Sequence, residues 1–148
     1  MSLFKVYRYE DLVLFPRMVL TDAGVFVETE PVDIISVENL AELVEHILSL
    51  LNSEPAAAQE SDLYSEEGDR FSAQSVLLTA LSIKKWHDFE RQSLLYTIHL
   101  TEDDLRLHVT GRGDNGLWSI QKSSVKSFPL SEGSSALALK IVNEIAAT

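Results

Sequence analysis

Apolar and polar residues alternate near the start of the chain, from Leu3 to Tyr9, and this pattern predicts a β-strand. Two further apolar runs flank the tripeptide 22–24, which ends in Gly24. They predict a hairpin, because glycine readily adopts the positive φ of a tight turn. We expect Pro31 to end the second strand of this hairpin, or to place it at a sheet edge, because proline has no backbone N–H to donate.

The clearest helix prediction covers residues 37–52. Apolar residues recur there three, four and seven positions apart, which is the spacing of one helical face. They are Val37, Leu40, Leu43, Val44, Ile47, Leu48 and Leu51. A short strand, Val32–Ile35, precedes this helix, and Ser36 is its expected N-cap. His46 lies beside the stripe, so we expect it at the boundary of the buried face.

The middle of the chain gives weaker signals. Residues 53–70 carry six acidic residues and one basic residue together with Pro, Gly and Ser, which predicts a long, solvated and mobile connection. The apolar run over residues 72–82 fits either a helix or a buried strand. Trp86 and Phe89 then lie three positions apart, as on one face of a helical turn.

The second half resumes with a strand signal. Residues 96–100 and 105–109 alternate in polarity around the loop "TEDD", which predicts a two-stranded hairpin. Residues 117–121 and 125–130 predict two more strands. Ser131 or Ser134 is the expected cap of a last helix. The expected buried stripe of that helix is Leu137, Ala138, Ile141, Val142 and Ile145.

The two halves resemble each other. Residues 18–27 align without a gap on residues 98–107, 80 positions later, and both units run from a hairpin through a further strand to a helix. We therefore predict one α+β domain over residues 1–148, with antiparallel sheet and helices packed on one face. The first unit is 1–52, the acidic connection 53–70, and the second unit 71–148 with an inserted hairpin near 111–124. Chance similarity of two amphipathic units remains the alternative to duplication.

Composition narrows the function. The net charge is −11, and the excess lies in residues 1–70, which hold 15 acidic and four basic residues, whereas residues 71–148 hold eight of each. Such a surface repels nucleic acid and anionic membranes and attracts basic proteins. No cysteine is present, so disulfides and thiolate metal sites are excluded. We find no signal peptide and no membrane-spanning run, which favours a cytoplasmic protein.

The stretch "HVTGRGDNGLW", residues 108–118, contains G-x-G-x-x-G and an Arg-Gly-Asp tripeptide. A dinucleotide fingerprint requires the glycines to open a helix, but strand-like residues follow Gly116. Adhesion through Arg112-Gly113-Asp114 would require an extracellular protein. We therefore interpret the stretch as a strand, a glycine-rich turn and the start of another strand.

His99 and His108 are the best candidates for catalytic or metal chemistry. A four-residue loop would pair residue 99 with 106 and residue 97 with 108, which makes the two histidines diagonal neighbours on one sheet face, roughly 7 Å apart. Two imidazoles at that spacing could help to hold a metal, but no third ligand stands at a fixed spacing. We therefore predict no metal and no other cofactor, and we keep a small metal- or ligand-dependent enzyme that uses the polar face around His99 and His108 as an alternative function.

One family resemblance is carried by "KKWHDFERQSLLYTIHLTEDDLRLHV" together with "FPLSEGSSALALKIVNEIAA". These segments, about a third of the chain, resemble the second half of immunity proteins of contact-dependent growth inhibition systems. The chain has Ser135-Ala136 where the family pattern leads us to expect a glycine, and the acidic connection has no counterpart. The resemblance implies a cytosolic antidote that binds a toxin domain, often a nuclease, and blocks its site.

We therefore predict a non-enzymatic acidic protein that binds a basic protein partner. The alternatives are the metal- or ligand-dependent enzyme and a structural protein that forms homo-oligomers, such as a homodimer. The expected partner-binding residues are Glu54, Glu60, Asp62, Glu66, Glu67, Asp69, Arg112, Asp114 and Trp118.

Overall fold

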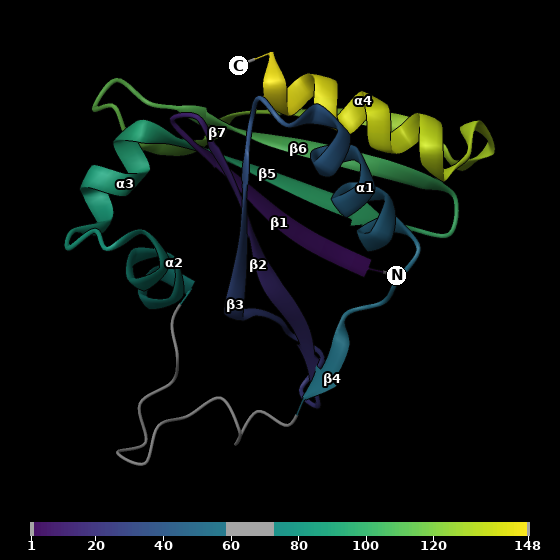
Figure 1. The fold of residues 1–148 in the computed structure, drawn as a ribbon, viewed down its shortest axis with the longest axis horizontal. Coiled ribbons are helices and arrows are strands. Elements are labelled where there is room, and N and C mark those ends of the chain that lie inside the picture. Colours follow the sequence, from purple (N-terminus) through teal and green to yellow (C-terminus); the bar gives the residue numbers. More distant parts are fainter. Residues whose placement is uncertain (1, 59–72, 148) are drawn as a thin grey trace.

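A computed structural model describes residues 2–58 and 73–147, and these ranges form one seven-stranded sheet with helices on both faces (Figure 1). The strands are β1 (Ser2–Tyr9), β2 (Leu12–Thr21), β3 (Phe26–Ser36), β4 (Ala56–Ala58), β5 (Ser93–Leu100), β6 (Asp104–Arg112) and β7 (Trp118–Pro129). Six of them follow the order β3-β2-β1-β5-β6-β7 with antiparallel neighbours, and β4 pairs in parallel with β2. The predicted α+β class is confirmed.

The sheet consists of two meanders that meet at its centre. Strands β1-β2-β3 lead into α1 (Leu40–Leu51), and strands β5-β6-β7 lead through the short 3-10 turn η2 (Leu130–Glu132) into α4 (Ser134–Ala146). β1 and β5 join them through eight antiparallel residue pairs, from Ser2–Leu100 to Tyr9–Ser93. The 80-residue offset that aligns the two halves of the sequence matches β2 with β5. By position within the two meanders, however, β5 corresponds to β1. Duplication of the two units stays a prediction.

The main core lies between the sheet and the two long helices. α1 and α4 lie side by side over one face (Figure 1). The predicted stripe of the last helix is confirmed, because Leu137, Ala138, Ile141, Val142 and Ile145 are all buried. In α1 the buried residues are Leu43, Ile47 and Leu51. Leu40, although part of the predicted stripe, is exposed, because it is the first residue of the helix and projects beyond the core.

The opposite face carries a second, smaller core. It contains Tyr7, Leu14, Leu77 and Phe89, and it is covered by α2 (Ala73–Leu81) and α3 (Trp86–Gln92). The open choice between helix and strand for residues 72–82 is thus decided for a helix, and the helical turn predicted at Trp86 is confirmed. The two long helices lie together on one face as expected, and these two short helices pack on the other.

The start of α1 differs from the prediction. Residues 32–36 continue β3 and do not form a separate strand, so Ser36 is the last residue of that strand. The N-cap is Asn39, whose side-chain oxygen accepts a hydrogen bond from the backbone N–H of Glu42. The Asn39 amide donates in return to the Glu42 carboxylate at 2.6 Å. The first bond satisfies the backbone N–H of Glu42 at the helix start, and the second is a side-chain contact that holds the cap in place. Ser36 lies three residues too early in the chain to serve as the cap. Pro31 lies within β3, which is an edge strand, as one of the two expectations required.

The second meander differs in β7. Residues 117–121 and 125–130 were expected to be two strands, but one continuous strand covers both. Val109 pairs with Ser124 while Gly111 pairs with Ser119, so a bulge in β7 absorbs the additional residues. The segment 111–124 forms the distal end of the β6–β7 hairpin, and its status as an insertion relative to the first unit stays a prediction.

The start of α4 also differs. The N-cap is Gly133, at φ 88°, instead of Ser131 or Ser134. Ser134 is the first helical residue, and its hydroxyl donates to the side-chain oxygen of Asn52 at the end of α1. At the other end of α4, the Arg8 guanidinium donates to the carbonyl oxygens of Ile145 and Ala146. These contacts fasten both ends of α4 to the first meander.

Part of the expected connection 53–70 is ordered as a strand. Ala56–Ala58 form β4 and pair with residues 19–21 of β2. Alanine is a weak strand former, so the free edge of β2 and not local propensity explains this pairing. Residues 59–70 of the connection lie outside the described residues. None of the helices in the described ranges has the length and apolar character that a membrane crossing requires.

Candidate functional site

The sheet divides between β1 and β2. These strands pair only over residues 7–9 and 12–14, next to the turn that joins them. They then diverge, as Figure 1 shows. Further along, the edge of β2 that β1 has left is taken by β4 at residues 19–21. In the described structure, residues 2–6 of β1 and 15–18 of β2 therefore face the division without a strand neighbour on that side.

A cavity of about 310 Å³ occupies this division, and we call it the cleft. The C-terminal half of α1 and the segment that leads into β4 complete its walls. Its lining residues are Phe4, Lys5, Phe15, Pro16, Arg17, Met18, Pro31, Asp33, His46, Leu50, Ser53, Glu54, Pro55 and Ala56. Phe4, Phe15 and Met18 are buried, so the cleft has an apolar floor. Charged side chains stand around that floor, as is typical of binding sites that combine an apolar anchor with polar selectivity.

His46 connects the floor of the cleft with its charged rim. Its ring lies 4.2 Å from the ring of Phe15, centroid to centroid, and its Nε2 lies 3.8 Å from a carboxylate oxygen of Asp33. Burial lowers the pKa of His46, and the nearby charges of Asp33 and Glu42 oppose this shift. Ser53 directs its hydroxyl to the carbonyl oxygen of Leu50, so it is not paired with the imidazole. The arrangement suits recognition of a polar group better than activation of a nucleophile.

A polar network lies behind Lys5. The Lys5 ammonium lies 3.4 Å from a carboxylate oxygen of Glu28, and the Tyr7 hydroxyl donates to the same oxygen at 2.6 Å. Glu28 is only 2 % exposed, and its second oxygen has no partner in the described structure. Burial raises the pKa of the Tyr7 phenol, and the Glu28 carboxylate raises it further. The phenol therefore keeps its proton and remains a hydrogen-bond donor.

The expected acidic site is described only at one residue. Glu54 is exposed at the rim of the cleft. The other predicted acidic residues, Glu60, Asp62, Glu66, Glu67 and Asp69, lie outside the described residues.

The three predicted residues of the glycine-rich turn differ in what they contact. The Arg112 guanidinium donates to the carbonyl oxygens of Glu90, Ser93 and Gly116, so it fastens the turn to the junction between α3 and β5. Asp114, in contrast, is fully exposed and lies 3.5 Å from the Lys122 ammonium. Of the tripeptide 112–114, the arginine side chain is therefore engaged in hydrogen bonds within the protein.

Trp118 is tied to the same junction. Its indole N–H donates to the carbonyl oxygen of Ser93 at 3.1 Å, and its ring lies 5.9 Å from that of Tyr7 and 5.6 Å from that of Trp86, centroid to centroid. Tyr7 belongs to the second core, which Trp118 partly covers. These contacts favour a structural role for Arg112 and Trp118.

His99 and His108 lie as the sequence predicts. Thr97 pairs with His108 and His99 pairs with Arg106, so the two histidines are diagonal neighbours on one face. Both are partly exposed. No group of three or more His, Asp or Glu side chains in residues 2–58 and 73–147 is arranged to hold a metal ion.

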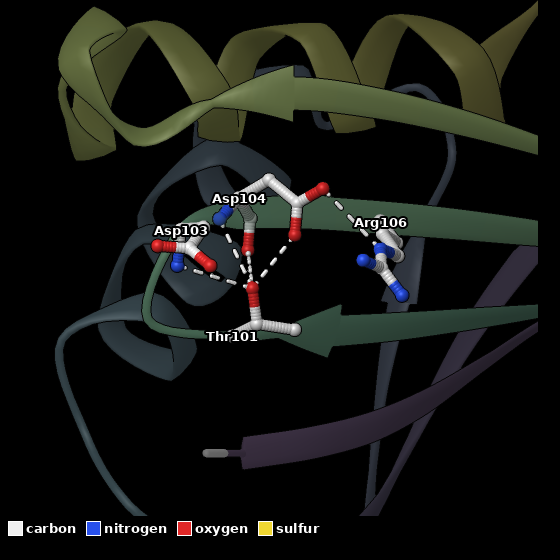
Figure 2. Close-up of polar contacts among 4 residues, drawn as sticks. All are labelled: Thr101, Asp103, Asp104 and Arg106. Carbon is white, nitrogen blue, oxygen red and sulfur yellow. Dashed lines mark hydrogen bonds and ion pairs between the residues drawn. The ribbon is translucent and has the colours of Figure 1, made fainter.

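The turn beside these histidines is closed by its own side chains (Figure 2). The Thr101 hydroxyl donates to the Asp104 carboxylate at 2.7 Å and accepts from the backbone N–H groups of Asp103 and Asp104. The Arg106 guanidinium donates to the other carboxylate oxygen of Asp104 at 3.2 Å. The Thr101 hydrogen bond, together with Arg106, lowers the pKa of Asp104. The acidic loop "TEDD" is thus a stabilised turn.

Sequence reasoning missed most of the cleft. Lys5 and Glu28 occupy polar positions of alternating strands, which indicate solvent exposure when read alone. His46 was placed correctly at the edge of the buried face, but Phe15 and Asp33, its contacts, lie on other elements. A signal in the sequence was the presence of Pro16 in β2 and Pro31 in β3, since proline lacks the backbone N–H that strand pairing uses.

Comparisons with known proteins agree with the fold. No protein-family model and no curated protein matches the sequence. A solved protein of unknown function from Neisseria meningitidis is similar over 98 % of this chain and 92 % of its own, with a TM-score of 0.62 and 12 % identity. A chain of the CdiA-CT/CdiI toxin and immunity complex from Yersinia pseudotuberculosis is similar over 97 % of this chain and 96 % of its own, with a TM-score of 0.60 and 11 % identity. At such identities the likeness shows a shared fold along nearly the whole chain.

Proposed function

We propose that this chain is a non-enzymatic binding protein of the immunity type, which docks a partner protein at the cleft. The observation that carries the proposal is the likeness, over nearly the full length of both chains, to a chain of a toxin and immunity complex. The sequence resemblance to immunity proteins of contact-dependent growth inhibition supports the same class. Such a protein acts by occupying its partner, so it needs a complementary surface and no catalytic group.

The cleft supports docking because it combines an apolar floor with unpaired strand backbone. Phe4, Phe15 and Met18 supply the floor. The facing edges of β1 and β2 leave backbone groups to which an extended segment of a partner can add hydrogen bonds. The outer edges of the sheet are less suitable. Pro31 removes a backbone donor from β3, and β7 is protected by its bulge, which contains Lys122, and by the charged Lys126 further along the strand.

Charge supports a basic partner. Residues 1–70 carry 15 acidic and four basic residues, and Glu54 places one of these charges at the rim of the cleft. A nuclease domain must hold phosphate and therefore often has a basic surface, which an acidic protein can approach rapidly and cover. We infer that Glu54 and the other acidic residues of the connection 53–70 guide such a partner to the cleft.

The experiment is capture of the product of the adjacent reading frame, followed by affinity measurements from low salt to about 0.5 M salt. We expect a stable complex that weakens as salt rises. One variant replaces the six predicted acidic residues with amides: Glu54, Glu60, Asp62, Glu66, Glu67 and Asp69. Its matched control replaces six exposed acidic residues elsewhere: Asp11, Glu38, Glu45, Asp88, Glu102 and Asp103. Equal loss of affinity in both variants would mean that net charge alone, and not the position of the acidic residues, strengthens binding. An affinity that changes neither with salt nor in either variant would contradict the proposal that acidic residues guide the partner.

A further inference from the structure

The cleft separates two lobes of the sheet. The first lobe is β2, β3 and β4, and the second is β1, β5, β6 and β7. Each lobe is held by long ladders, such as the nine pairs between β2 and β3 and the eight pairs between β1 and β5. Among the described residues, the strands of the two lobes share only the three pairs between residues 7–9 and 12–14. Backbone hydrogen bonds therefore hold the lobes together at the closed end of the division, and other contacts must fix its width beyond that end.

The network of Tyr7, Lys5 and Glu28 spans this division. Tyr7 and Lys5 belong to the second lobe, and Glu28 belongs to the first. Tyr7 is the last residue of β1 that pairs with β2, whereas Glu28 pairs with Met18, beyond the last paired residue of β2. The Tyr7–Glu28 hydrogen bond of 2.6 Å and the Lys5–Glu28 ion pair of 3.4 Å therefore connect the lobes where no ladder does.

The Glu28 carboxylate is costly to the fold. It is 2 % exposed, has one hydrogen-bond donor and one ion-pair partner, and leaves its second oxygen without a partner in the described structure. Lys5 is 37 % exposed, so water screens its charge and weakens the compensation. Buried charges of this kind are commonly matched or exceeded in stability by apolar residues of similar size. Stability alone therefore does not account for a carboxylate at this position.

We propose that Glu28 is a positioning residue, which sets the separation of the two lobes and thereby the width of the cleft. Its carboxylate accepts the hydrogen bond of the Tyr7 hydroxyl and holds the Lys5 ammonium at the wall of the cleft. We call the Tyr7–Glu28 and Lys5–Glu28 contacts the bridge. The importance of the cleft width for docking rests on the proposed function, whereas the effect of the bridge on that width can be tested on the isolated protein.

The test uses the fact that the chain has no cysteine, so two introduced cysteines carry spin labels cleanly. Ala23→Cys and Glu102→Cys place the labels in two exposed turns at the open end of the division, one on each lobe. Double electron–electron resonance then measures the distribution of distances between the two spin labels. We expect a narrow distribution in the parent protein. Glu28→Ala should displace its maximum and broaden it, and Tyr7→Phe should do the same to a smaller extent.

Glu28→Gln is the conservative variant. Its amide oxygen can still accept from Tyr7, so we expect it to restore the parent distribution. Glu45→Ala is the matched control, since it removes an exposed carboxylate from α1, and it should change nothing. Circular dichroism confirms that each labelled variant is folded. Should Glu28→Ala remain folded with the parent distribution, the bridge does not set the width.

A second measurement separates this inference from the proposed function. The product of the adjacent reading frame is titrated against the unlabelled parent, Glu28→Ala and Glu28→Gln. We expect Glu28→Ala to bind about tenfold more weakly than the other two, which corresponds to about 1.4 kcal/mol. Absence of binding to the parent would contradict the proposed function and leave the distance result intact. Equal affinity of all three would contradict the role of the width in docking, whereas the distance distributions alone decide whether Glu28 sets that width.

Discussion

Gly111 is the residue of the glycine-rich stretch whose replacement should damage the fold most. A Cβ atom added at this position would lie 2.0 Å from the backbone carbonyl oxygen of Lys122 and 2.3 Å from its carbonyl carbon. Lys122 lies in the bulge of β7 opposite the end of β6. The close approach of these two backbones is possible because glycine has no side chain. We therefore predict that Gly111→Ala is strongly destabilising.

The magnitude follows from the distance that the strands must move. Ordinary contact begins at 3.4 Å, so the Lys122 carbonyl must retreat by about 1.4 Å from the added methyl group. Such a shift breaks or weakens the adjacent pairing of Gly111 with Ser119 and of Arg112 with Trp118. Overpacking costs about 1–3 kcal/mol, and each lost hydrogen bond costs about 1 kcal/mol. We expect a loss of about 3–5 kcal/mol in the free energy of unfolding, or about 6–20 °C in Tm.

Two neighbouring glycines provide controls within the same stretch. At Gly113 the added Cβ would approach the Asn115 side chain at 3.2 Å, which a small side-chain movement can relieve, so Gly113→Ala should cost less than about 1 kcal/mol. At Gly116 the space is open but φ is +80°, so Gly116→Ala should cost about 1–2 kcal/mol through backbone strain. Thermal and urea unfolding followed by circular dichroism measure all three. A Gly111→Ala variant as stable as Gly113→Ala would refute the close backbone approach.

Three further predictions concern stability. Ser93→Ala should leave Tm unchanged or raise it, because the buried Ser93 hydroxyl has no partner in the described structure; a fall of several degrees would reveal a missed hydrogen bond. Arg112→Lys should lower the free energy of unfolding by about 1–3 kcal/mol, because an ammonium cannot reach three carbonyl groups, and parity with the parent in urea unfolding would contradict that. Asp104→Asn should flatten the acid limb of the stability–pH profile. The folded-state pKa of Asp104 is lowered, so its contribution is present above the unfolded pKa and disappears as pH falls through the folded one; an unchanged acid limb would exclude this role.

The helices and strands were predictable because each shows the periodicity of apolar residues that is typical of its type. The stripe of α4 lies entirely on the core side, and the burial of β1 alternates from Ser2 to Val6 before both Val6 and Tyr7 are buried. Even the register of β5 and β6 followed from the sequence, since a short loop fixes which residues face each other. Helix caps were less predictable. Ser36, Ser131 and Ser134 all have capping side chains, yet the chain uses Asn39 and Gly133, because the neighbouring strand and turn extend further than their local patterns indicate.

The cleft was not predictable, because it depends on which strands become neighbours. Nothing local to β1 or β2 says that they part after three residue pairs, or that Ala56–Ala58 will pair with β2. Likewise, a polar residue in an alternating strand is expected to face water. Glu28 instead contacts Tyr7, which lies not on the neighbouring strand but on the strand after it. The sequence pattern of an exposed polar residue is the same as that of a polar residue buried in such a contact.

The most direct test of docking at the cleft compares two neighbouring alanines of β4. Ala56 lines the cleft, whereas Ala57 does not, because successive side chains of a strand point to opposite faces. Both are exposed, so Ala56→Trp and Ala57→Trp add the same bulk with little risk to the fold. The measurement is the affinity of each variant for the partner captured from the adjacent reading frame. We predict that Ala56→Trp binds at least about 100-fold more weakly than the parent, about 2.7 kcal/mol, while Ala57→Trp binds like the parent. Full affinity of a folded Ala56→Trp variant would contradict docking at the cleft.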